Sequence, residues 1–308
     1  MNQFGVMVGV DKKDSFEGWF CKIDDKKNNL LFSVIWGYST HATTRHAFIQ
    51  FQNGLTHSTE YISFPIEELL FEQDPFTLHI GNNMLSLHQM KLDLCIKGEV
   101  VRGIFTFQQL TPIKQSFLKP NIMGILTYLP NECNHSIVSM DHKVSGQLQL
   151  GEKSFLIENA KGYMEKDWGT GFPKEYVWVQ ANDFSESSVV FSYATIPVLG
   201  RFAKGFLVVL IHQGQEYRFT SVEGGRIQNF QVGKDYFSCD LKKGDILIQL
   251  NAKQLNPVEL ASPVHGEMKN YIKESLDGEM MIRVYKKGNL IIELSTTRAS
   301  IDVHFLVD

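Results

Sequence analysis

The sequence lacks any apolar run long enough to cross a membrane. In 308 residues, the longest uninterrupted apolar stretch runs from Phe206 to Ile211, whereas a membrane-spanning helix needs about 20 such residues. Residues Met1 to Val10 lack the charged region, apolar core and small-residue cleavage site of a secretory signal. We therefore expect a cytoplasmic protein without a transmembrane segment.

The sequence also lacks a large excess of charge of either sign. The chain carries 30 Lys and Arg against 34 Asp and Glu, so its net charge is −4. A protein with no basic surplus cannot neutralise many phosphates, which argues against nucleic acid as a partner and against charge-driven binding to anionic membranes. The four cysteines are widely scattered and form no C-x-x-C pair, as expected for free thiols in a reducing compartment.

Motifs for the common cofactors and nucleophiles are absent. The sequence contains no G-x-S-x-G elbow, no phosphate-binding G-x-x-x-x-G-K-[ST] loop, no H-E-x-x-H helix and no G-x-G-x-x-G fingerprint. Cys133-Asn134-His135 is too small a cluster for a zinc site. We expect no metal and no cofactor.

What the sequence does contain is a long series of short, β-branched and aromatic segments separated by Gly, Asn, Asp and Lys turns. Helical signal is weak: Pro65 to Glu72 suggests two turns, and Met268 to Leu276 is ambiguous between helix and strand. Strands in series without alternating helices predict an all-β protein built from antiparallel sandwiches or barrels. The candidate strands are Phe16–Ile23, Leu30–Trp36, His46–Phe51, Phe76–Ile80, Met90–Ile96, Val100–Gln108, Ser136–Leu150, Tyr176–Phe184, Val189–Ile196, Phe206–His212, Glu216–Val222, Asp245–Asn251, Met280–Tyr285 and Leu290–Ser295.

The length suggests two domains, or one large all-β domain. No linker or internal repeat marks a division. We place the boundary approximately at residue 155, which gives domains 1–155 and 156–308.

In the stretch from Gly162 to Pro173, the six residues between Gly162 and Gly169 include two carboxylates and two aromatic residues. If it is extended, Tyr163, Glu165 and Asp167 project to one face. Repulsion between the carboxylates in an apolar cavity would raise one pKa and keep that carboxyl protonated, as an acid catalyst requires. The alternative is an edge strand whose charges are solvated.

The next strand alternates Tyr176, Trp178 and Gln180 with small apolar residues, and Asn182 continues the first set. Aromatic surface with a few amides suits a mainly apolar ligand that carries one or two oxygen functions. Alternatively, the amides only satisfy buried backbone groups.

Two further residues are candidate acids. Glu17 shares a strand face with Trp19, which fits either a second pocket acid or a half-exposed strand. His142 lies on an otherwise apolar strand face, where a histidine is either a core residue or a proton carrier near neutral pH.

Several of these segments together resemble the tocopherol cyclase family. The resemblance lies in Gly162–Pro173 followed by Trp178–Phe184, and in Phe16–Phe20, Pro120–Gly124, Glu132–His135, Ser139–His142 and Lys273–Leu276. It implies two lipocalin-like antiparallel β-barrel modules in tandem. It also implies a reaction in which a prenylated benzoquinol closes to a chromanol.

The chemistry of that reaction suggests roles for the candidate residues. An acid protonates the alkene, aromatic faces stabilise the cation, and a phenol oxygen traps it. The hypotheses for the acid are Glu165 or Asp167, with Glu17 and His142 as rivals. The hypotheses for substrate binding are Trp19, Tyr163, Trp168, Trp178, Gln180 and Asn182.

Three functions stay open at this stage. The first is a cyclase of a prenylquinol or related isoprenoid, the second a non-catalytic lipocalin-like carrier, and the third a hydratase or isomerase of an isoprenoid alkene. All three imply a hydrophobic small-molecule partner, fetched through at most a transient contact with a membrane surface.

Overall fold

The fold was analysed in a computed structural model, which describes residues 4–117, 119–128, 131–198 and 201–305. Its elements are almost entirely β-strands, and the pairings between neighbouring strands are antiparallel. The all-β expectation is confirmed. In the described part of the chain, no helix combines the length and the apolarity that crossing a bilayer would require.

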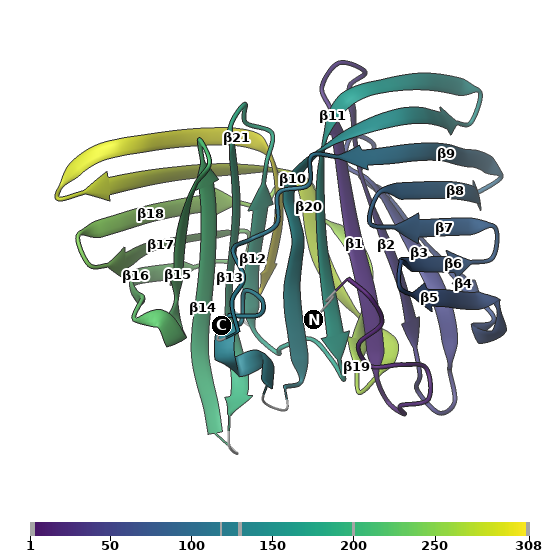
Figure 1. The fold of residues 1–308 in the computed structure, drawn as a ribbon, viewed down its shortest axis with the longest axis horizontal. Coiled ribbons are helices and arrows are strands. Elements are labelled where there is room, and N and C mark those ends of the chain that lie inside the picture. Colours follow the sequence, from purple (N-terminus) through teal and green to yellow (C-terminus); the bar gives the residue numbers. More distant parts are fainter. Residues whose placement is uncertain (1–3, 118, 129–130, 199–200, 306–308) are drawn as a thin grey trace. The chain divides into compact units, whose positions relative to one another are not determined.

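The chain forms two compact units, each with its own sheet and core (Figure 1). Unit 1 comprises residues 1–112, 135–171 and 261–270, and unit 2 comprises residues 113–134, 172–260 and 271–308. The main division therefore follows Gly171 instead of residue 155, which lies inside a long strand, Lys153–Gly169. The units are also not simply in tandem, because each includes a segment from beyond that division.

The sheet of unit 1 has eleven strands in the order β4-β3-β2-β1-β11-β10-β9-β8-β7-β6-β5. Its strands are β1 (Phe16–Asp25), β2 (Leu30–Ser39), β3 (His46–Asn53), β4 (Ser58–Phe64), β5 (Leu69–Gln73), β6 (Phe76–Ile80), β7 (Asn83–Ser86), β8 (Gln89–Ile96), β9 (Glu99–Gln108), β10 (Cys133–Leu150) and β11 (Lys153–Gly169). Side chains of one strand face, among them Trp19, Trp36 and Phe105, form the core.

The second sheet runs β15-β14-β13-β12-β21-β20-β18-β17-β16, and β19 pairs with β20. It belongs to unit 2 except for residues 261–270, the end of β19 and the start of β20, which are part of unit 1. Its strands are β12 (Tyr176–Ala181), β13 (Ser187–Val198), β14 (Arg201–His212), β15 (Gln215–Thr220), β16 (Arg226–Val232), β17 (Tyr236–Lys243), β18 (Ile246–Lys253), β19 (Val258–Val264), β20 (Glu267–Lys286) and β21 (Asn289–His304). Its separate core contains Val179, Phe191 and Ile301.

Local sequence explains where the strands turn. Between β20 and β21, Lys287 and Gly288 both have positive φ (51° and 83°), as a tight two-residue hairpin turn requires. The segment expected to be helical at 65–72 forms a short 3-10 turn, η1 (Ile66–Glu68), and then β5, because Leu69 packs into the core. The ambiguous segment 268–276 is strand, within β20.

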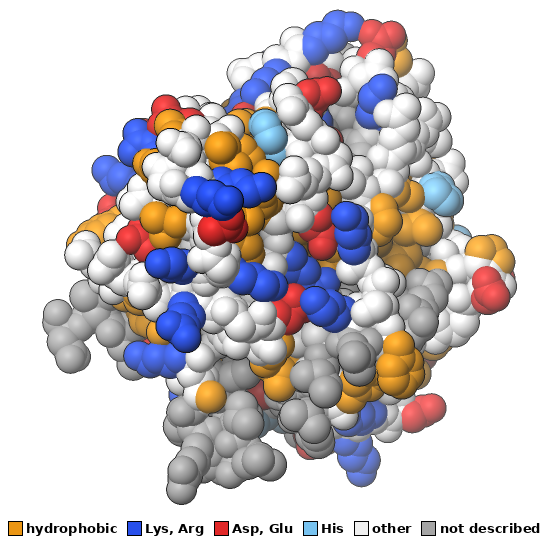
Figure 2. Space-filling model, turned by 60° about the vertical axis from the view of Figure 1, so that its left-hand side comes forward, with side chains coloured by type: hydrophobic (Ala, Val, Ile, Leu, Met, Phe, Trp, Pro, Cys, Tyr) orange, Lys and Arg blue, Asp and Glu red, His pale blue; other side chains and the backbone are white. Residues whose placement is uncertain are grey.

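Two further 3-10 turns lie outside the sheets, η2 (Gly124–Tyr128) and η3 (Ser221–Glu223). On the surface in Figure 2, Lys and Arg side chains are interspersed with acidic, apolar and uncharged ones.

Candidate active site

The predicted carboxylate stretch begins in β11, where Gly162–Gly169 form the end of the strand, and continues beyond it to Pro173. Cα pairing with β1 sets Tyr163 opposite Lys22 and Glu165 opposite Phe20. Met164, between them, belongs to the core of unit 1. Because successive side chains of a strand point to opposite faces, Tyr163, Glu165 and Asp167 lie on the sheet face away from that core. Tyr163 and Glu165 are nevertheless buried.

His135, near the start of β10, lies between the two carboxylates. Its Nδ1 is 2.8 Å from Oδ1 of Asp167, and its Nε2 is 3.6 Å from Oε2 of Glu165. The first distance is a hydrogen bond and the second is an ion-pair distance. The hydroxyl of Tyr163 donates to Oε2 of Glu165 at 2.5 Å. We call these four residues the His135 cluster.

This arrangement puts the proton on the imidazole. Burial by itself would lower the pKa of His135, but the charges of Glu165 and Asp167 outweigh it and raise that pKa to about 9. Burial and the same carboxylates raise the pKa of Tyr163 well above its ordinary value, so the phenol stays a neutral donor. The expected protonated carboxyl stays a prediction; the raised pKa of His135 makes its imidazolium a further candidate for the proton donor.

The three acidic and basic members also form a group with metal-ligand atoms within 4.8 Å of one another: His135, Glu165 and Asp167. However, the two ring nitrogens of His135 face different carboxylates. That geometry holds a charged ring in place. A metal bound by one nitrogen of His135 and one oxygen of each carboxylate would have to take the place of at least one of these contacts.

Glu17 lies on the opposite face of the same two strands. Its Cα pairs with Trp168, and Lys166 pairs with Trp19, so these four side chains face the interior of unit 1. There Glu17 forms a fully buried ion pair with Lys166 and accepts a hydrogen bond from Tyr38. Burial lowers the pKa of Lys166 to about 8 against the opposing effect of Glu17. The Lys166 ammonium lies 4.6 Å from the Trp19 ring centroid and 5.4 Å from that of Trp168.

The same side chains hold the backbone of the N-terminal segment, residues 4–9. Glu17 accepts hydrogen bonds from the amides of Met7 (2.6 Å) and Val8 (3.2 Å). Trp19 donates to the carbonyl of Phe4 at 2.6 Å, and Lys166 donates to that of Gly5.

We call Glu17, Trp19, Tyr38 and Lys166 the N-terminal latch; Tyr38 completes it by accepting from the amide of Gly9 at 3.1 Å. Glu17, Trp19 and Trp168, three predicted site residues, thus lie in a structural cluster apart from Glu165.

His142, the other predicted proton carrier, is a core residue. Its ring packs edge-on against Phe107, with centroids 5.0 Å apart, and Nδ1 lies 3.2 Å from the hydroxyl of Ser139. Burial lowers its pKa to about 3. The imidazole is therefore neutral near pH 7 and has no proton to give to a substrate.

In unit 2, β12 separates two sets of side chains as its alternation predicts. Val177, Val179 and Ala181 belong to the core of unit 2, so Tyr176, Trp178 and Gln180 lie on the other face, where they are also buried. Gln180 donates to the side-chain oxygen of Asn182 at 3.0 Å.

Next to this strand lies an acid that the sequence reasoning missed. Asp302 of β21 pairs with Trp178, and Glu274 of β20 pairs with Asp302. Tyr176 donates its hydroxyl proton to Oδ2 of Asp302. Burial raises the pKa of Asp302 to about 7, although the Tyr176 hydrogen bond opposes it.

His135 and Glu274 were also missed as site residues. Both belong to segments that carry the family resemblance, 132–135 and 273–276. That resemblance is the sequence feature that could have identified them as site residues.

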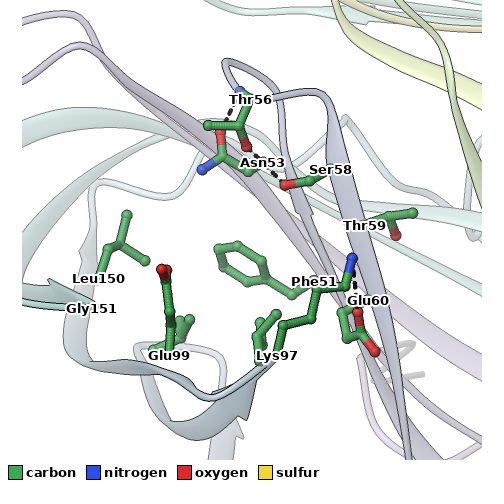
Figure 3. Close-up of a pocket in the computed structure, with 12 residues that line it drawn as sticks. Phe51, Asn53, Thr56, Ser58, Thr59, Glu60, Lys97, Glu99, Leu150 and Gly151 are labelled. Atoms are coloured by element: carbon green, nitrogen blue, oxygen red, sulfur yellow. Dashed lines mark hydrogen bonds and ion pairs between the residues drawn. The ribbon is translucent and has the colours of Figure 1, made fainter.

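A hollow of about 290 Å³ in unit 1 is lined by residues that belong neither to the His135 cluster nor to the N-terminal latch. Figure 3 shows Phe51 and Leu150 on its apolar side and the Lys97–Glu60 ion pair on its rim. None of the predicted site residues lines it.

Comparison with known proteins gives a consistent picture. A family model described as tocopherol cyclase-like matches residues 101–304. Over 172 residues, the chain is 23% identical to a chloroplastic protein of Oryza sativa subsp. japonica named as a probable tocopherol cyclase, and 22% identical to the chloroplastic tocopherol cyclase of Zea mays. These alignments cover 52% of this chain but 37% and 36% of the relatives, so the chain spans well under half of their length.

Among solved structures, an AttH-like protein from Nitrosomonas europaea aligns with a TM-score of 0.57 at 9% identity, over 98% of this chain and 95% of that one. Kievitone hydratase from Nectria haematococca aligns with a TM-score of 0.53 at 11% identity, over 93% and 88%. At such identities the likeness concerns the fold, and it confirms the expected lipocalin-like architecture.

Proposed function

Because the chain belongs to the tocopherol cyclase-like family, we propose that it is an acid-catalysed cyclase of a prenylated benzoquinol or a related isoprenoid. The observation that carries the proposal is the His135 cluster: an imidazolium, 15% exposed, held by Glu165 and Asp167 beside the neutral phenol of Tyr163. Such a group suits general acid catalysis, since it is fully charged at neutral pH and its orientation is set by two partners.

The proposed reaction is an isomerisation and needs no oxidant or reductant. His135 donates its proton to one carbon of a trisubstituted alkene, and the positive charge develops on the other, tertiary carbon. The phenol oxygen of the ring attacks that carbon and forms the new C–O bond. The phenol proton is released and restores the imidazolium, so atoms and charge balance over one turnover.

The surroundings of His135 fit the demands of a carbocation. Burial of Glu165 and Tyr163 limits the access of water, which would trap the cation, to one side of the cluster. The ring of Tyr163 lies on the same face of β11 as Glu165 and Asp167, the two partners of the acid, and can stabilise positive charge. Trp168 faces the interior of unit 1, on the opposite side of β11 from Glu165, so it does not face the His135 cluster. In unit 2, we propose Trp178, Gln180 and Asn182 as ligand-binding residues.

Two alternatives use the same pocket chemistry differently. In a hydratase, water traps the cation. In a carrier, nothing is protonated, and the group of His135, Glu165 and Asp167 would be structural, as the buried Glu17–Lys166 pair is. What favours a catalyst is that the two carboxylates raise the pKa of His135 to about 9 and so keep it in its proton-donating form.

The test is incubation of the purified chain with prenylated benzoquinols of several chain lengths. A cyclase yields a fluorescent chromanol of unchanged mass, and a hydratase yields a product heavier by one water. If ligands bind but neither product forms at any chain length, the carrier stands and the cyclase proposal fails.

A further inference from the structure

The buried polar face of unit 2 contains a second cluster with unused hydrogen-bonding capacity. Three neighbouring strands, β12, β21 and β20, bring Trp178, Asp302 and Glu274 into one row of directly paired residues. On β12 and β21 the adjacent row pairs Gln180 with Ser300. Directly paired residues share a sheet face, so these side chains lie together.

This face is distinct from the hydrophobic core of the unit. Ala299, Ile301 and Val303 alternate with Ser300 and Asp302 along β21, and all three belong to the core. The polar residues thus point the other way, yet Ser300 is fully buried and Asp302 is 2% exposed. A solvated outer face would show neither value.

Two buried oxygens on this face have no hydrogen-bond partner among the described residues: Oδ1 of Asp302 and Oγ of Ser300. Native proteins rarely leave such atoms unsatisfied, because each costs free energy that a partner would recover. The other carboxylate oxygen of Asp302 is held by Tyr176, so the orientation of Oδ1 is fixed. A carboxylate oxygen accepts a hydrogen bond and a serine hydroxyl donates one, so the two together can bind a hydroxyl group, which is both donor and acceptor.

From this geometry we propose that Asp302 and Ser300 bind a hydroxyl group of an aromatic ligand, a phenol or hydroquinone, beside the ring of Trp178. The ligand hydroxyl donates to Oδ1 of Asp302 and accepts from the hydroxyl of Ser300. Tyr176 is a positioning residue, because it holds Oδ2 and leaves Oδ1 for the ligand. For the choice of a hydroquinone, this inference rests on the proposed function, but binding does not require turnover.

Several titratable groups surround the proposed site. They are Tyr176 of β12, Glu274 of β20 and His304 of β21, whose ring packs against that of Tyr176. Cys133 of unit 2 is also close enough to raise the pKa of Tyr176. Burial raises the pKa of Asp302 and lowers that of His304. Ionised Asp302 is the better acceptor for a phenol, so binding should strengthen as pH rises through about 7.

The experiment compares binding of hydroquinone with that of its dimethyl ether, which has the same ring without the hydroxyl donors, by ligand-observed NMR. We expect Asp302→Asn to weaken hydroquinone binding roughly tenfold, the usual effect of losing a hydrogen bond to a charged group. Ser300→Ala should weaken it less, and the ether should bind weakly to every variant. Asp240→Asn, on β17 of the same unit and bonded to Asn229 and Gln249, is the matched control.

The outcomes separate this proposal from the cyclase. If hydroquinone binds wild type no better than the ether does, water satisfies the two oxygens and the inference is wrong. Equal hydroquinone affinity of wild type, Asp302→Asn and Ser300→Ala also overturns it. Binding that depends on Asp302 without any chromanol would support the site and refute only the cyclase. Should Asp302→Asn fail to fold, Ser300→Ala decides alone.

Discussion

Glu165 and Lys166 are neighbours in the sequence, but their side chains point to opposite faces of β11 and belong to different clusters. Glu165 lies 3.6 Å from His135 on the outer face, whereas Lys166 pairs with Glu17 in the interior of unit 1. One short motif therefore supplies both a candidate catalytic group and a structural latch. Substitutions on the outer face should change activity, and those on the inner face should change stability.

Replacing His135 by Asn should abolish cyclisation while sparing the fold. The amide keeps a donor but has no acidic proton, and general acid catalysis contributes about 10²–10⁴ in rate. The measurement is kcat on a prenylated benzoquinol, with the thermal midpoint as a check on folding. His142→Asn, a buried histidine of the same strand that contacts Phe107 instead of carboxylates, is the matched control. Equal loss of activity in both variants would contradict the assignment of His135 as the acid.

Activity should depend on pH through the same residue. His135 must be protonated to act, and its pKa is about 9. The rate should therefore hold through neutral pH and fall as pH rises through about 9. The profile of kcat/KM reports this pKa for the free enzyme. A decline already complete by pH 7 would instead indicate a carboxyl acid such as Glu165.

Acid should destabilise the fold in part through His142. Burial holds its pKa at about 3 in the folded protein, against an ordinary value of 6.5 in the unfolded chain. Between these values the unfolded chain binds a proton that the folded chain does not. The contribution to stability is thus present above about pH 6.5 and is lost as pH falls, by at most about 1.4 kcal/mol per unit. Urea unfolding at pH 7 and pH 4 measures the loss. It should be smaller in His142→Asn; an identical loss in that variant would contradict the assignment.

Glu17→Gln should destabilise unit 1 without acting on the acid itself. Removing one partner of a buried ion pair typically costs about 3–5 kcal/mol, although Lys166 can limit the loss by releasing its proton. The denaturant midpoint measures the effect. Glu158→Gln, which breaks an exposed pair with Lys27, should change it little. If the Gln variant were stable but inactive, Glu17 and not His135 would be the acid.

Removal of metal ions should leave turnover unchanged. His135, Glu165 and Asp167 are close enough to bind an ion, but the two ring nitrogens face different carboxylates. Dialysis against a chelator followed by the cyclisation assay tests this. If activity were lost and a divalent cation restored it, the His135 cluster would be a metal site and this prediction would be wrong.

Much of the architecture follows from local pattern. The two-residue period of a strand correctly places Tyr163, Glu165 and Asp167 on one face, and it separates Trp178 and Gln180 from the core side of β12. These are properties of a few consecutive residues, so no knowledge of pairing is needed.

Other parts of the site depend on register between distant strands. Only the pairing of β1 with β11 shows that Glu17 lies opposite Trp168, away from Glu165. The contact between His135 and Asp167 likewise depends on the folded structure, because the two residues are thirty-two positions apart in the sequence.

The predicted strands Met280–Tyr285 and Leu290–Ser295 also stop short of Glu274 and Asp302. The reason is that buried polar side chains resemble exposed ones in a sequence.

The exchange of segments between the two units has a practical consequence. Arg218 of β15 donates to the backbone carbonyls of Asn121 (2.6 Å) and Lys114 (3.2 Å). Both carbonyls belong to residues 113–134, the segment of unit 2 that comes before Gly171 in the sequence. A gene truncated to begin after Gly171 would lack those carbonyls, so the buried Arg218 guanidinium would lose both hydrogen bonds and keep its ion pair with Glu223 at 3.5 Å. Single-cut fragments should therefore be insoluble when expressed alone and regain solubility only when both pieces are produced together.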